Sequence, residues 1–477
     1  MTQENPEYHF LQSALSTKNA FNTTQQVLDW LNVRKAEIEI KIDKIPFSEL
    51  ENWHFDPDSG NIVHQSGKFF SIEGIDVQTN WGFVPHWQQP IINQPEVGIL
   101  GIVCKKIDGI LHFLLQAKIE PGNINFVQLS PTVQATKSNY TQVHKGNKPR
   151  YLEYFINDGS VNAQVLLDQL QSEQGARFLK KRNRNIIVET TDDIALHPDF
   201  CWLTLAQIKQ LLLHDNVINM DTRTVISTID FSGDYTTQEI DQIVAQNSTA
   251  STYHNDLLRS TLEKNNALHS FKHIISWITN HKANYELQVN SIALKDVAKW
   301  QKNETEIFHE QKKYFSVIAV RVTISNREVR SWSQPLIESA QDGLIVFIIK
   351  KINGIYHFLV QAKLEAGNFD IVELAPTVQC LNDNYRQSIN EQKPEFLDYV
   401  LHINPDQIRY DTHQSEEGGR FYKEQNRNLI IEAGEQFATE LPPNYIWMTY
   451  NQMNVFIQFN NYFNIEARSL ISAISFL

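Results

Sequence analysis

Cysteine is scarce in this chain of 477 residues, which contains only Cys104, Cys201 and Cys380. The odd number and wide spacing argue against a disulfide framework. The closely spaced cysteine pairs of zinc sites are also missing. In the other copy of the repeat described below, each cysteine is matched by an apolar residue. We therefore expect buried structural thiols in a reducing compartment, and neither metal ligands nor nucleophiles.

Long apolar runs and basic blocks are missing as well. No stretch approaches the ~18 apolar residues that suggest a membrane-spanning helix. The first residues, MTQENPEYHF, lack the basic and then apolar order of a signal peptide. The net charge is −13, without a lysine- or arginine-rich stripe. These absences predict a cytoplasmic protein that binds neither membranes nor nucleic acid.

Motifs that hold a nucleotide cofactor or a metal are not found either. The sequence has no P-loop, no GxGxxG fingerprint, no GxSxG elbow, no HExxH and no CxxC. An enzyme with this sequence would work by acid–base chemistry of its own side chains. We expect no cofactor and no metal.

What the chain does contain is an internal repeat. Residues 112–140 and 357–385 are identical at 17 of 29 positions at a fixed offset of 245. Many shared residues are polar, and a fold alone rarely needs so many fixed polar side chains on strands and turns. The likeness continues to Arg177 and Arg420. Two copies of a polar-lined site are therefore the first hypothesis.

The length and the repeat predict two domains. We expect a first repeat over residues 1–216, a connection over 217–262 and a second repeat over 263–477. The connection contains NMDTRTVIS at 219–227, for which the other copy offers no evident partner, and a polar stretch at 236–252 that is typical of a linker. NMDTRTVIS either lines a site or clasps the domains.

The same order of elements is expected in both copies. In the first copy we expect helices at 23–31, 45–53, 161–171 and 204–213, and strands at 98–106, 110–118, 126–135 and 184–190. In the second copy the matching helices include 270–278, 292–300 and 449–457. Asp108-Gly109 and Asn353-Gly354 predict hairpin turns. The fold class is α+β, with mixed sheets flanked by helices.

A row of polar residues on one strand is the main site candidate. Gln116, Lys118 and Glu120 share a face, because side chains alternate along a strand, and the row ends in a turn at Asn123. A solvated sheet face is the common alternative. The second copy repeats the polar row while its apolar neighbours vary, and this favours a site.

The other candidates have plain structural alternatives. Trp87 and Trp332 could stack on a base, and Asn139 and Tyr140 could bind a base or a sugar, although buried aromatic residues often belong to a core. Pro131 sits within a strand and indicates an edge or a bulge that either binds a ligand or protects the sheet.

Arginines could bind a diphosphate through their forked donors, with surface ion pairing as the alternative. Arg177, Arg182 and Arg184 make the first copy locally basic, whereas Arg182 is replaced by glutamine in the second copy. His144 and Tyr151 are likewise lost there, and such residues are candidates for chemistry that only one site performs.

These motifs resemble those of the NDP-4-keto-6-deoxyhexose 2,3-dehydratases of deoxysugar biosynthesis. The likeness rests on AKIEPGNINFVQLSPTVQATKSNYTQVHKG (117–146), SEQGARF (172–178), KRNRN (181–185), NMDTRTV (219–225), AKLEAGNFDIVELAPTVQ (362–379) and GGRFYKEQNRN (418–428). The resemblance implies tandem Nudix-like domains from a gene duplication, a homodimer and no organic cofactor. The Nudix box REx₂EExG is absent from both copies.

The resemblance also implies a nucleotide-sugar substrate, dTDP-linked in the family's usual case, and coupling to an NDP-hexose 3-ketoreductase. The reaction would remove the C3 proton of the 4-keto sugar and expel the C2 hydroxyl, giving a 3,4-diketo-2,6-dideoxyhexose nucleotide. A noncatalytic sugar-nucleotide-binding protein and a divergent Nudix-type hydrolase are the alternatives.

The chemistry of this reaction suggests roles for the candidate residues. We expect catalysis in the first repeat, with Glu120 or His144 as base, Tyr140 as acid and Lys118 as oxyanion donor. The first-repeat substrate-binding candidates are Trp87, Gln116, Asn123, Thr132, Gln134, Ser138, Asn139, Tyr151, Arg177, Arg182 and Arg184. The second-repeat candidates for binding the sugar nucleotide are Trp332, Gln361, Lys363, Glu365, Asn368, Thr377, Gln379, Asn384, Tyr385, Arg420 and Arg427.

Overall fold

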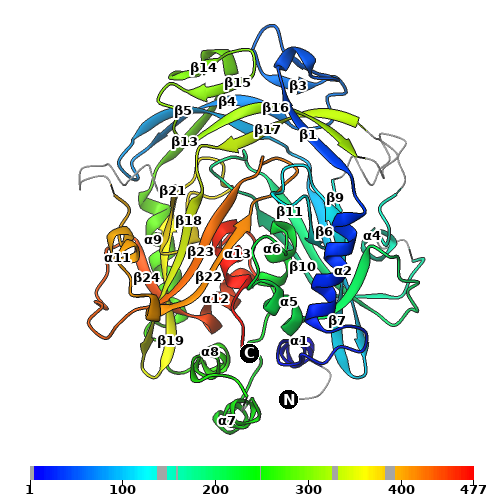
Figure 1. Cartoon of the computed structure of the whole chain (residues 1–477). Helices are drawn as coiled ribbons and strands as arrows, with labels where there is room; N and C mark the ends of the chain where they lie inside the picture. The colour runs from blue at the N-terminus through cyan, green and yellow to red at the C-terminus, as the bar shows by residue number, and fades with distance from the viewer. Residues whose placement is uncertain (1–4, 137–147, 157–158, 248, 325–330, 382–392) are drawn as a thin grey trace.

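The two halves of the chain have similar folds and lie side by side (Figure 1). This computed structural model describes residues 5–136, 148–156, 159–247, 249–324, 331–381 and 393–477. Each half forms one seven-stranded sheet, and both halves contribute strands to each of two five-stranded sheets, with helices packed around them. The expected mixed sheets flanked by helices are confirmed, while the Nudix-like topology stays a prediction.

A seven-stranded mixed sheet forms the body of each half. In the first half, strands follow the order β10-β11-β6-β7-β12, with β8 beside β7 and β9 beside β6. Their bounds are β6 Gly98–Ile107, β7 Ile110–Ile119, β8 Val127–Ser130, β9 Val133–Ala135, β10 Ala163–Ser172, β11 Arg182–Thr190 and β12 Phe200–Thr204. The matching strands of the second half are β18 Gly343–Ile352, β19 Ile355–Lys363, β20 Glu373–Ala375, β21 Val378–Leu381, β22 Ile408–Ser415, β23 Gln425–Glu432 and β24 Tyr445–Thr449.

The predicted hairpins are confirmed in both sheets. Asp108 and Gly109 have φ values of 50° and 81°, and Asn353 and Gly354 have φ values of 53° and 84°. Two successive positive φ values are what a two-residue type I′ turn requires. The turns fix the register of β6 with β7 and of β18 with β19.

The five-stranded sheets are completed by an exchange of strands between the halves (Figure 1). The sheet of the first half contains β2 Trp53–Phe55, β3 Ile62–His64, β4 Ser71–Thr79 and β5 His86–Asn93, and β4 pairs with β13 Leu287–Ile292 from the second half. The other sheet contains β14 Trp300–Lys302, β15 Glu306–His309, β16 Phe315–Ile324 and β17 Ser331–Ser339, and β16 pairs with β1 Ile40–Ile45 from the first half. Each half therefore lends its first strand to the other.

Helices cover the sheets and fill the space between the halves. The longer ones are α1 Pro6–Ala14, α2 Thr24–Ala36, α5 Leu205–Leu211, α6 Met220–Ser227, α7 Thr237–Gln246, α8 Thr252–Leu262, α9 Phe271–Asn284, α12 Tyr450–Ile457 and α13 Ile465–Ser472. The short ones are α4 Glu153–Ile156, α11 Leu397–Leu401 and the 3₁₀ turns η1 Phe47–Glu49, η2 Leu294–Asp296 and η4 Pro405–Gln407. Capping boxes that begin at Thr204 and Thr449 start α5 and α12.

Two buried arginines join α6 and α13 at the centre of the molecule. Arg223 and Arg468 are each 1% exposed. Arg223 donates Nε to Ser469 Oγ at 2.8 Å, and Arg468 donates Nε to Thr224 Oγ1 at 2.9 Å. The two helices also share the offset of 245, so NMDTRTVIS does have a counterpart, in NIEARSLIS. The assumption that it had none was wrong, because the helix keeps few identical residues besides its asparagine and arginine.

The halves also interlock through two glycine loops. Gly122 donates its backbone N–H to Gly418 O at 2.7 Å, and Gly367 donates to Gly175 O at the same distance. A Cβ on Gly122 would lie 1.6 Å from Phe421 O. Glycine is needed here because backbone from the opposite half approaches closely.

Four expected elements were wrong. The expected helix at 292–300 is reduced to the 3₁₀ turn η2. Residues 161–171 form strand β10 instead of a helix, with a bulge that shifts its register. The expected linker at 236–252 holds α7 and the start of α8, and Thr236 caps α7 with a capping box. The expected helix at 45–53 is reduced to the 3₁₀ turn η1. In each case long-range packing or local capping outweighed the pattern of residue types.

One continuous apolar core extends through both halves and includes Phe113, Phe231 and Phe358. Cys104 and Cys201 are buried within it, which confirms them as structural thiols. Cys380 is only partly buried, on β21. Burial nevertheless raises the pKa of its thiol to about 11, so the thiolate is disfavoured at neutral pH.

Candidate functional site

A cluster of lysine, glutamate and amide side chains lies at the end of β7 in the first half. Glu120 is 4% exposed. Gln134 donates Nε2 to Glu120 Oε1 at 2.6 Å, and Asn123 donates Nδ2 to Oε2 at 3.1 Å. Lys118 Nζ lies 3.8 Å from Glu120 Oε1. The predicted row is therefore a buried, hydrogen-bonded cluster and differs from a solvated sheet face.

The same cluster recurs at the end of β19 in the second half. Gln379 donates Nε2 to Glu365 Oε1 at 3.0 Å, and Lys363 Nζ lies 3.9 Å from the same oxygen. Lys363 also donates to the carbonyl oxygen of Gln379 at 3.1 Å. Asn368 is 4% exposed, and its side-chain polar atoms have no hydrogen-bond partner within the part of the chain that the structure describes.

Helix α6 adds two residues to the first cluster that the sequence did not predict. Asn219 caps the helix with Oδ1 and donates Nδ2 to Gln134 Oε1 at 3.1 Å. Asp221, in the first turn, is 3% exposed. Burial, followed by repulsion from Glu173 and Glu120, raises the pKa of the Asp221 carboxyl well above its ordinary value.

Helix α13 adds the equivalent pair to the second cluster. Asn464 donates Nδ2 to Gln379 Oε1 at 2.7 Å. Glu466 is 5% exposed, and burial, followed by repulsion from Glu365 and Glu416, strongly raises its pKa. The signal that could have revealed both pairs is the pattern Asn-x-(Asp or Glu)-x-Arg, which recurs at the offset of 245.

Each cluster receives its arginine from the opposite half. Arg420 interacts electrostatically with Glu120, and its guanidinium lies 4.2 Å from the ring centroid of Phe70. Arg177 interacts in the same way with Glu365. Burial lowers the pKa of both guanidinium groups. The charges of Glu417 and then Glu120 partly offset this for Arg420. Those of Glu424 and then Glu365 do so for Arg177. The assignment of Arg177 to the first cluster and of Arg420 to the second is thus reversed, because the glycine loops cross between the halves.

A cavity of about 1190 Å³ opens beside the second cluster. Its polar wall includes Gln361, Lys363 and Gln379, and Arg177 reaches it from the first half. Its aromatic lining consists of Trp81, Phe83, Trp87, Tyr285, Trp300, Tyr314, Phe315 and Tyr445. The cavity combines cationic side chains, which bind a diphosphate, with aromatic rings, which stack on a nucleobase. It therefore suits a nucleotide.

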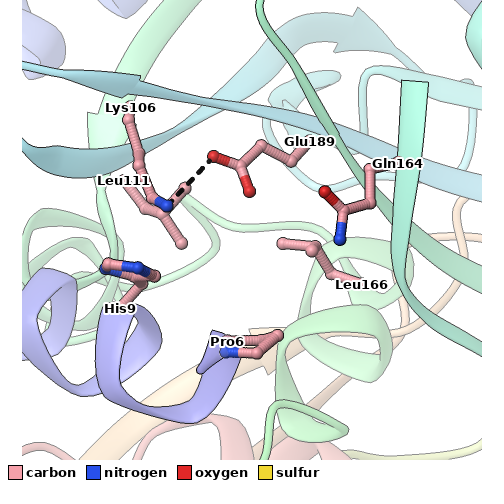
Figure 2. Close-up of a pocket in the computed structure, with 7 residues that line it drawn as sticks. All are labelled: Pro6, His9, Lys106, Leu111, Gln164, Leu166 and Glu189. Atoms are coloured by element: carbon pink, nitrogen blue, oxygen red, sulfur yellow. Dashed lines mark ion pairs between the residues drawn. The ribbon is translucent and has the colours of Figure 1, made fainter. Parts of the chain in front are cut away.

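A smaller cavity of about 200 Å³ lies against α1, away from the predicted residues (Figure 2). It is lined by Pro6, His9, Lys106, Leu111, Gln164, Leu166 and Glu189. Lys106 Nζ lies 3.6 Å from Glu189 Oε1. The second half has the bulkier Tyr356 at the position of Leu111. The hydroxyl of Tyr356 donates to Glu432, at the position that corresponds to the cavity. The cavity therefore reflects a difference in packing.

Several predicted residues have structural roles. Thr132 Oγ1 accepts from Val103 N at 2.9 Å and donates to the Leu114 carbonyl at 2.5 Å, which joins β6 to β7. Thr377 makes the equivalent contacts in the second half. Tyr151 donates its hydroxyl to the Ala195 carbonyl at 2.9 Å. The hydroxyl groups of these side chains are hydrogen-bonded to the backbone.

Two predicted arginines form the surface ion pairs that were the alternative to diphosphate binding. Arg184 pairs with Asp168 at 2.6 Å, and Arg427 pairs with Asp411 at 2.6 Å. Both pairs lie between neighbouring strands of a sheet and are partly exposed. Neither arginine belongs to a cluster described above.

The remaining predicted residues either make contacts outside the clusters or lie outside the described residues. Arg182 stacks on Phe369 at 4.7 Å, and Trp332 donates Nε1 to Gln334 at 2.9 Å. Gln116 is half-buried on β7. The residues Ser138, Asn139, Tyr140, His144, Asn384 and Tyr385 lie outside the described residues.

The described residues contain neither a cluster of the metal-binding kind nor a helix of the membrane-spanning kind. No three histidine, cysteine, aspartate or glutamate side chains in them come together in the manner of a metal site. No helix in the same ranges is long and apolar enough to cross a membrane.

The fold defines a duplicated protein of strands and helices in which each half holds a buried lysine–carboxylate cluster. A family model described as NDP-hexose 2,3-dehydratase matches residues 24–229 and 271–474, and the chain belongs to this family. The two matches correspond to the two halves and include both α6 and α13.

Three proteins that are similar to this chain share one name. The chain is 46% identical over 465 residues to dTDP-4-dehydro-6-deoxy-alpha-D-glucopyranose 2,3-dehydratase of Saccharopolyspora spinosa, covering 98% of this chain and 94% of the relative. It is 44% identical to the protein of that name from Amycolatopsis orientalis, covering 97% and 92%. The relative from Streptomyces violaceoruber is 42% identical, covering 93% and 95%.

Proposed function

We propose that this chain is a hydro-lyase that catalyses the 2,3-dehydration of dTDP-4-keto-6-deoxy-D-glucose in deoxysugar biosynthesis. The product would be a 3,4-diketo-2,6-dideoxyhexose nucleotide. The observation that carries the proposal is the cluster of Lys363, Glu365 and Gln379 beside a cavity of about 1190 Å³. The name shared by three relatives supports the reaction and the substrate.

The reaction needs a base at C3 and a donor at the C4 oxygen. The C3 proton is acidic because the adjacent ketone stabilises the enolate that forms when the proton leaves. In our proposal Glu365 removes this proton, and Lys363 stabilises the developing charge on the C4 oxygen. Arg177 binds the diphosphate of the nucleotide, and Trp87 packs against its nucleobase.

The geometry favours the second repeat as the catalytic one, whereas the sequence favoured the first. The argument for the first repeat rested on Tyr151, Arg182 and His144. Tyr151 is occupied by backbone contacts, and Arg182 stacks on Phe369 of the second half. Catalysis at Glu120 in the first repeat stays a prediction, and paired variants test it below.

A trapping assay tests the proposed reaction. Purified protein is incubated with dTDP-4-keto-6-deoxyglucose in D₂O and EDTA, and a 3-ketoreductase with NADPH traps the diketone. We expect NMR to detect a 2,6-dideoxy-4-keto sugar nucleotide with deuterium at C2. Unchanged substrate that still stabilises the protein against heat would indicate a noncatalytic binding protein. Release of a nucleoside monophosphate that requires Mg²⁺ would indicate a Nudix-type hydrolase.

We further infer that the protein is a cytoplasmic homodimer that acts beside an NDP-hexose 3-ketoreductase. The family resemblance supports the dimer, and the instability of a diketone supports rapid transfer to a reductase. Light scattering after gel filtration tests the assembly. A mass of about twice 55.2 kDa is expected, and a mass of 55.2 kDa would contradict the dimer.

A further inference from the structure

We propose that Glu466 is the proton donor of the second-repeat site and works as a pair with Glu365. Glu365 takes the C3 proton, and Glu466 gives a proton to the departing C2 hydroxyl. This inference rests on the proposed function, which left the acid unassigned.

The first argument is that hydrogen bonds tie the start of α13 to the base. Asn464 caps the helix and donates Nδ2 to Gln379 Oε1 at 2.7 Å. Gln379 in turn donates Nε2 to Glu365 Oε1 at 3.0 Å. Glu466 lies two residues beyond the cap, within the same buried region as Glu365 and Lys363. The helix therefore delivers a second carboxyl to the cluster at a fixed position.

The second argument is that both carboxyls keep an unused oxygen. Glu466 and Glu365 are 5% and 6% exposed, and Oε2 of each has no hydrogen-bond partner among the residues that the structure describes. Leaving such atoms unpaired in a buried place costs about 1–3 kcal/mol each. Lys363 and Gln379, which contact Glu365, line the large cavity. The two glutamates are not part of the cavity lining, so the proposal requires a bound sugar to reach past Lys363 and Gln379 to their unpaired oxygens.

The charges around Glu466 favour its protonated form. Burial, then the negative charges of Glu365 and Glu416, raise the pKa of Glu466, while Lys363 opposes the shift. Arg177 and Arg468 also face Glu466 and favour its charged form. Burial is the largest of these effects, so the protonated form of Glu466 is favoured. Gln379 and Lys363 both contact Oε1 of Glu365 and leave its other oxygen to face the substrate in our proposal.

A pair of this kind resets itself in each turnover. Abstraction of the C3 proton by Glu365 leaves an enolate, which expels the C2 hydroxyl with the proton of Glu466, so that water leaves and a C2=C3 enol remains. The enol then takes the proton of Glu365 at C2 and gives its hydroxyl proton to Glu466. The product is the 3,4-diketone, and both carboxyls return to their starting states. No external acid, oxidant or reductant is consumed.

The first half contains an equivalent of Glu466, which allows the two repeats to be compared. Asp221 stands in α6 at the position of Glu466, beside Glu120, and one of its oxygens, Oδ1, is also without a partner in the described ranges. Loss of turnover in Asp221→Asn but not in Glu466→Gln would place the acid in the first half and overturn the inference. The control is Glu435→Gln, an exposed carboxylate outside both clusters, which should keep wild-type turnover while Glu466→Gln removes it.

Isotope exchange separates the base from the acid. In D₂O with dTDP-4-keto-6-deoxyglucose, we expect Glu466→Gln to exchange the C3 proton for deuterium, seen by NMR, while product formation falls at least 100-fold. Glu365→Gln should lose both exchange and product formation. Binding of dTDP, measured by calorimetry, should change less than threefold in both variants. Glu466→Asp should restore part of the turnover and shift the alkaline limb of the pH profile.

Several outcomes would overturn the inference. Wild-type turnover in Glu466→Gln, or loss of exchange together with product while dTDP still binds, would exclude Glu466 as the acid. If Glu466→Gln fails to fold, an unchanged pH profile in a folded Glu466→Asp would have the same meaning. An inactive wild type that binds dTDP would instead reject the proposed function itself, and with it the role of Glu466.

Discussion

Equivalent buried positions in the two halves are occupied by Gln128 and Glu373, and this difference makes the second half sensitive to pH. Ser415 Oγ donates to Gln128 Oε1 at 2.8 Å, and Ser172 Oγ donates to Glu373 Oε2 at 2.7 Å. Burial raises the pKa of Glu373 to about 8, although the hydrogen bond from Ser172 and the charge of Arg468 act against it. The glutamate is therefore held in its protonated form at neutral pH.

The change Glu373→Gln should flatten the dependence of stability on pH. The folded pKa of about 8 lies above the ordinary value of 4.5, so the protonated carboxyl stabilises the fold fully below pH 4.5. This contribution is lost as the pH rises through 8, at about 1.4 kcal/mol per pH unit below that value. Urea unfolding between pH 6 and pH 9 should show a smaller loss in the variant than in the wild type. Parallel curves would contradict this prediction.

Paired variants of the two glutamates should identify the catalytic repeat. We expect Glu365→Gln to lower kcat by about 100-fold or more, since a general base is typically worth that much. Glu120→Gln should change kcat by less than about fivefold, because the large cavity lies at the second cluster. Initial rates in the trapping assay measure both. The reverse result would assign catalysis to the first repeat.

The glycine loops are the elements that hold the halves in register. A Cβ at Gly122 would lie 1.6 Å from Phe421 O, and one at Gly367 would lie 1.7 Å from Phe178 O. Gly122→Ala or Gly367→Ala should therefore lower the free energy of unfolding by about 1–3 kcal/mol or more, as overpacked sites do. Gly434→Ala is the control, because the nearest atom to its Cβ is 3.9 Å away. Equal stability of all three variants would contradict the interlock.

Local signals in the sequence were sufficient for some elements and insufficient for others. Asp108-Gly109 predicted its hairpin, because that turn needs residues that tolerate positive φ. Residues 161–171 were predicted as a helix, because VLLDQLQ fits a helical pattern as well as a strand. Pairing with β11 makes this segment a strand. The exchange of β1 and β13 could not be predicted, since no local pattern distinguishes a strand of one half from the equivalent strand of the other.

At the scale of the whole molecule, the sequence predicted the members of the clusters better than their grouping. Glu120 and Gln134 do meet, because β9, which carries Gln134, and β7, which ends directly before Glu120, both pair with β6. Arg177 and Arg420 were assigned to their own halves, although the loops that carry them cross to the other half. Asp221 was not named as a site residue, because the sequence left open whether its motif lines a site or clasps the domains. Crossing contacts of this kind arise from three-dimensional packing, which the repeat alone does not encode.

Cutting the connection between the halves should not separate them. We expect that a protease site inserted after Asn265, in the exposed turn between α8 and α9, can be cleaved while both fragments still elute together. The exchanged strands and the shared apolar core provide the association. Native gel filtration measures it, and an insertion without a cleavable sequence is the control. Two separate fragment peaks would contradict this expectation.

The exchange of β1 and β13 also determines what a single repeat could do. Alone, one repeat would have an unpaired edge on its five-stranded sheet, a spare first strand with nothing to join, and a lysine–carboxylate cluster without its arginine. Two identical single-repeat chains would meet all three needs by swapping strands and loops around a twofold axis. Fusion of the two chains turns this symmetric pair into one polypeptide, in which each site can change independently of the other.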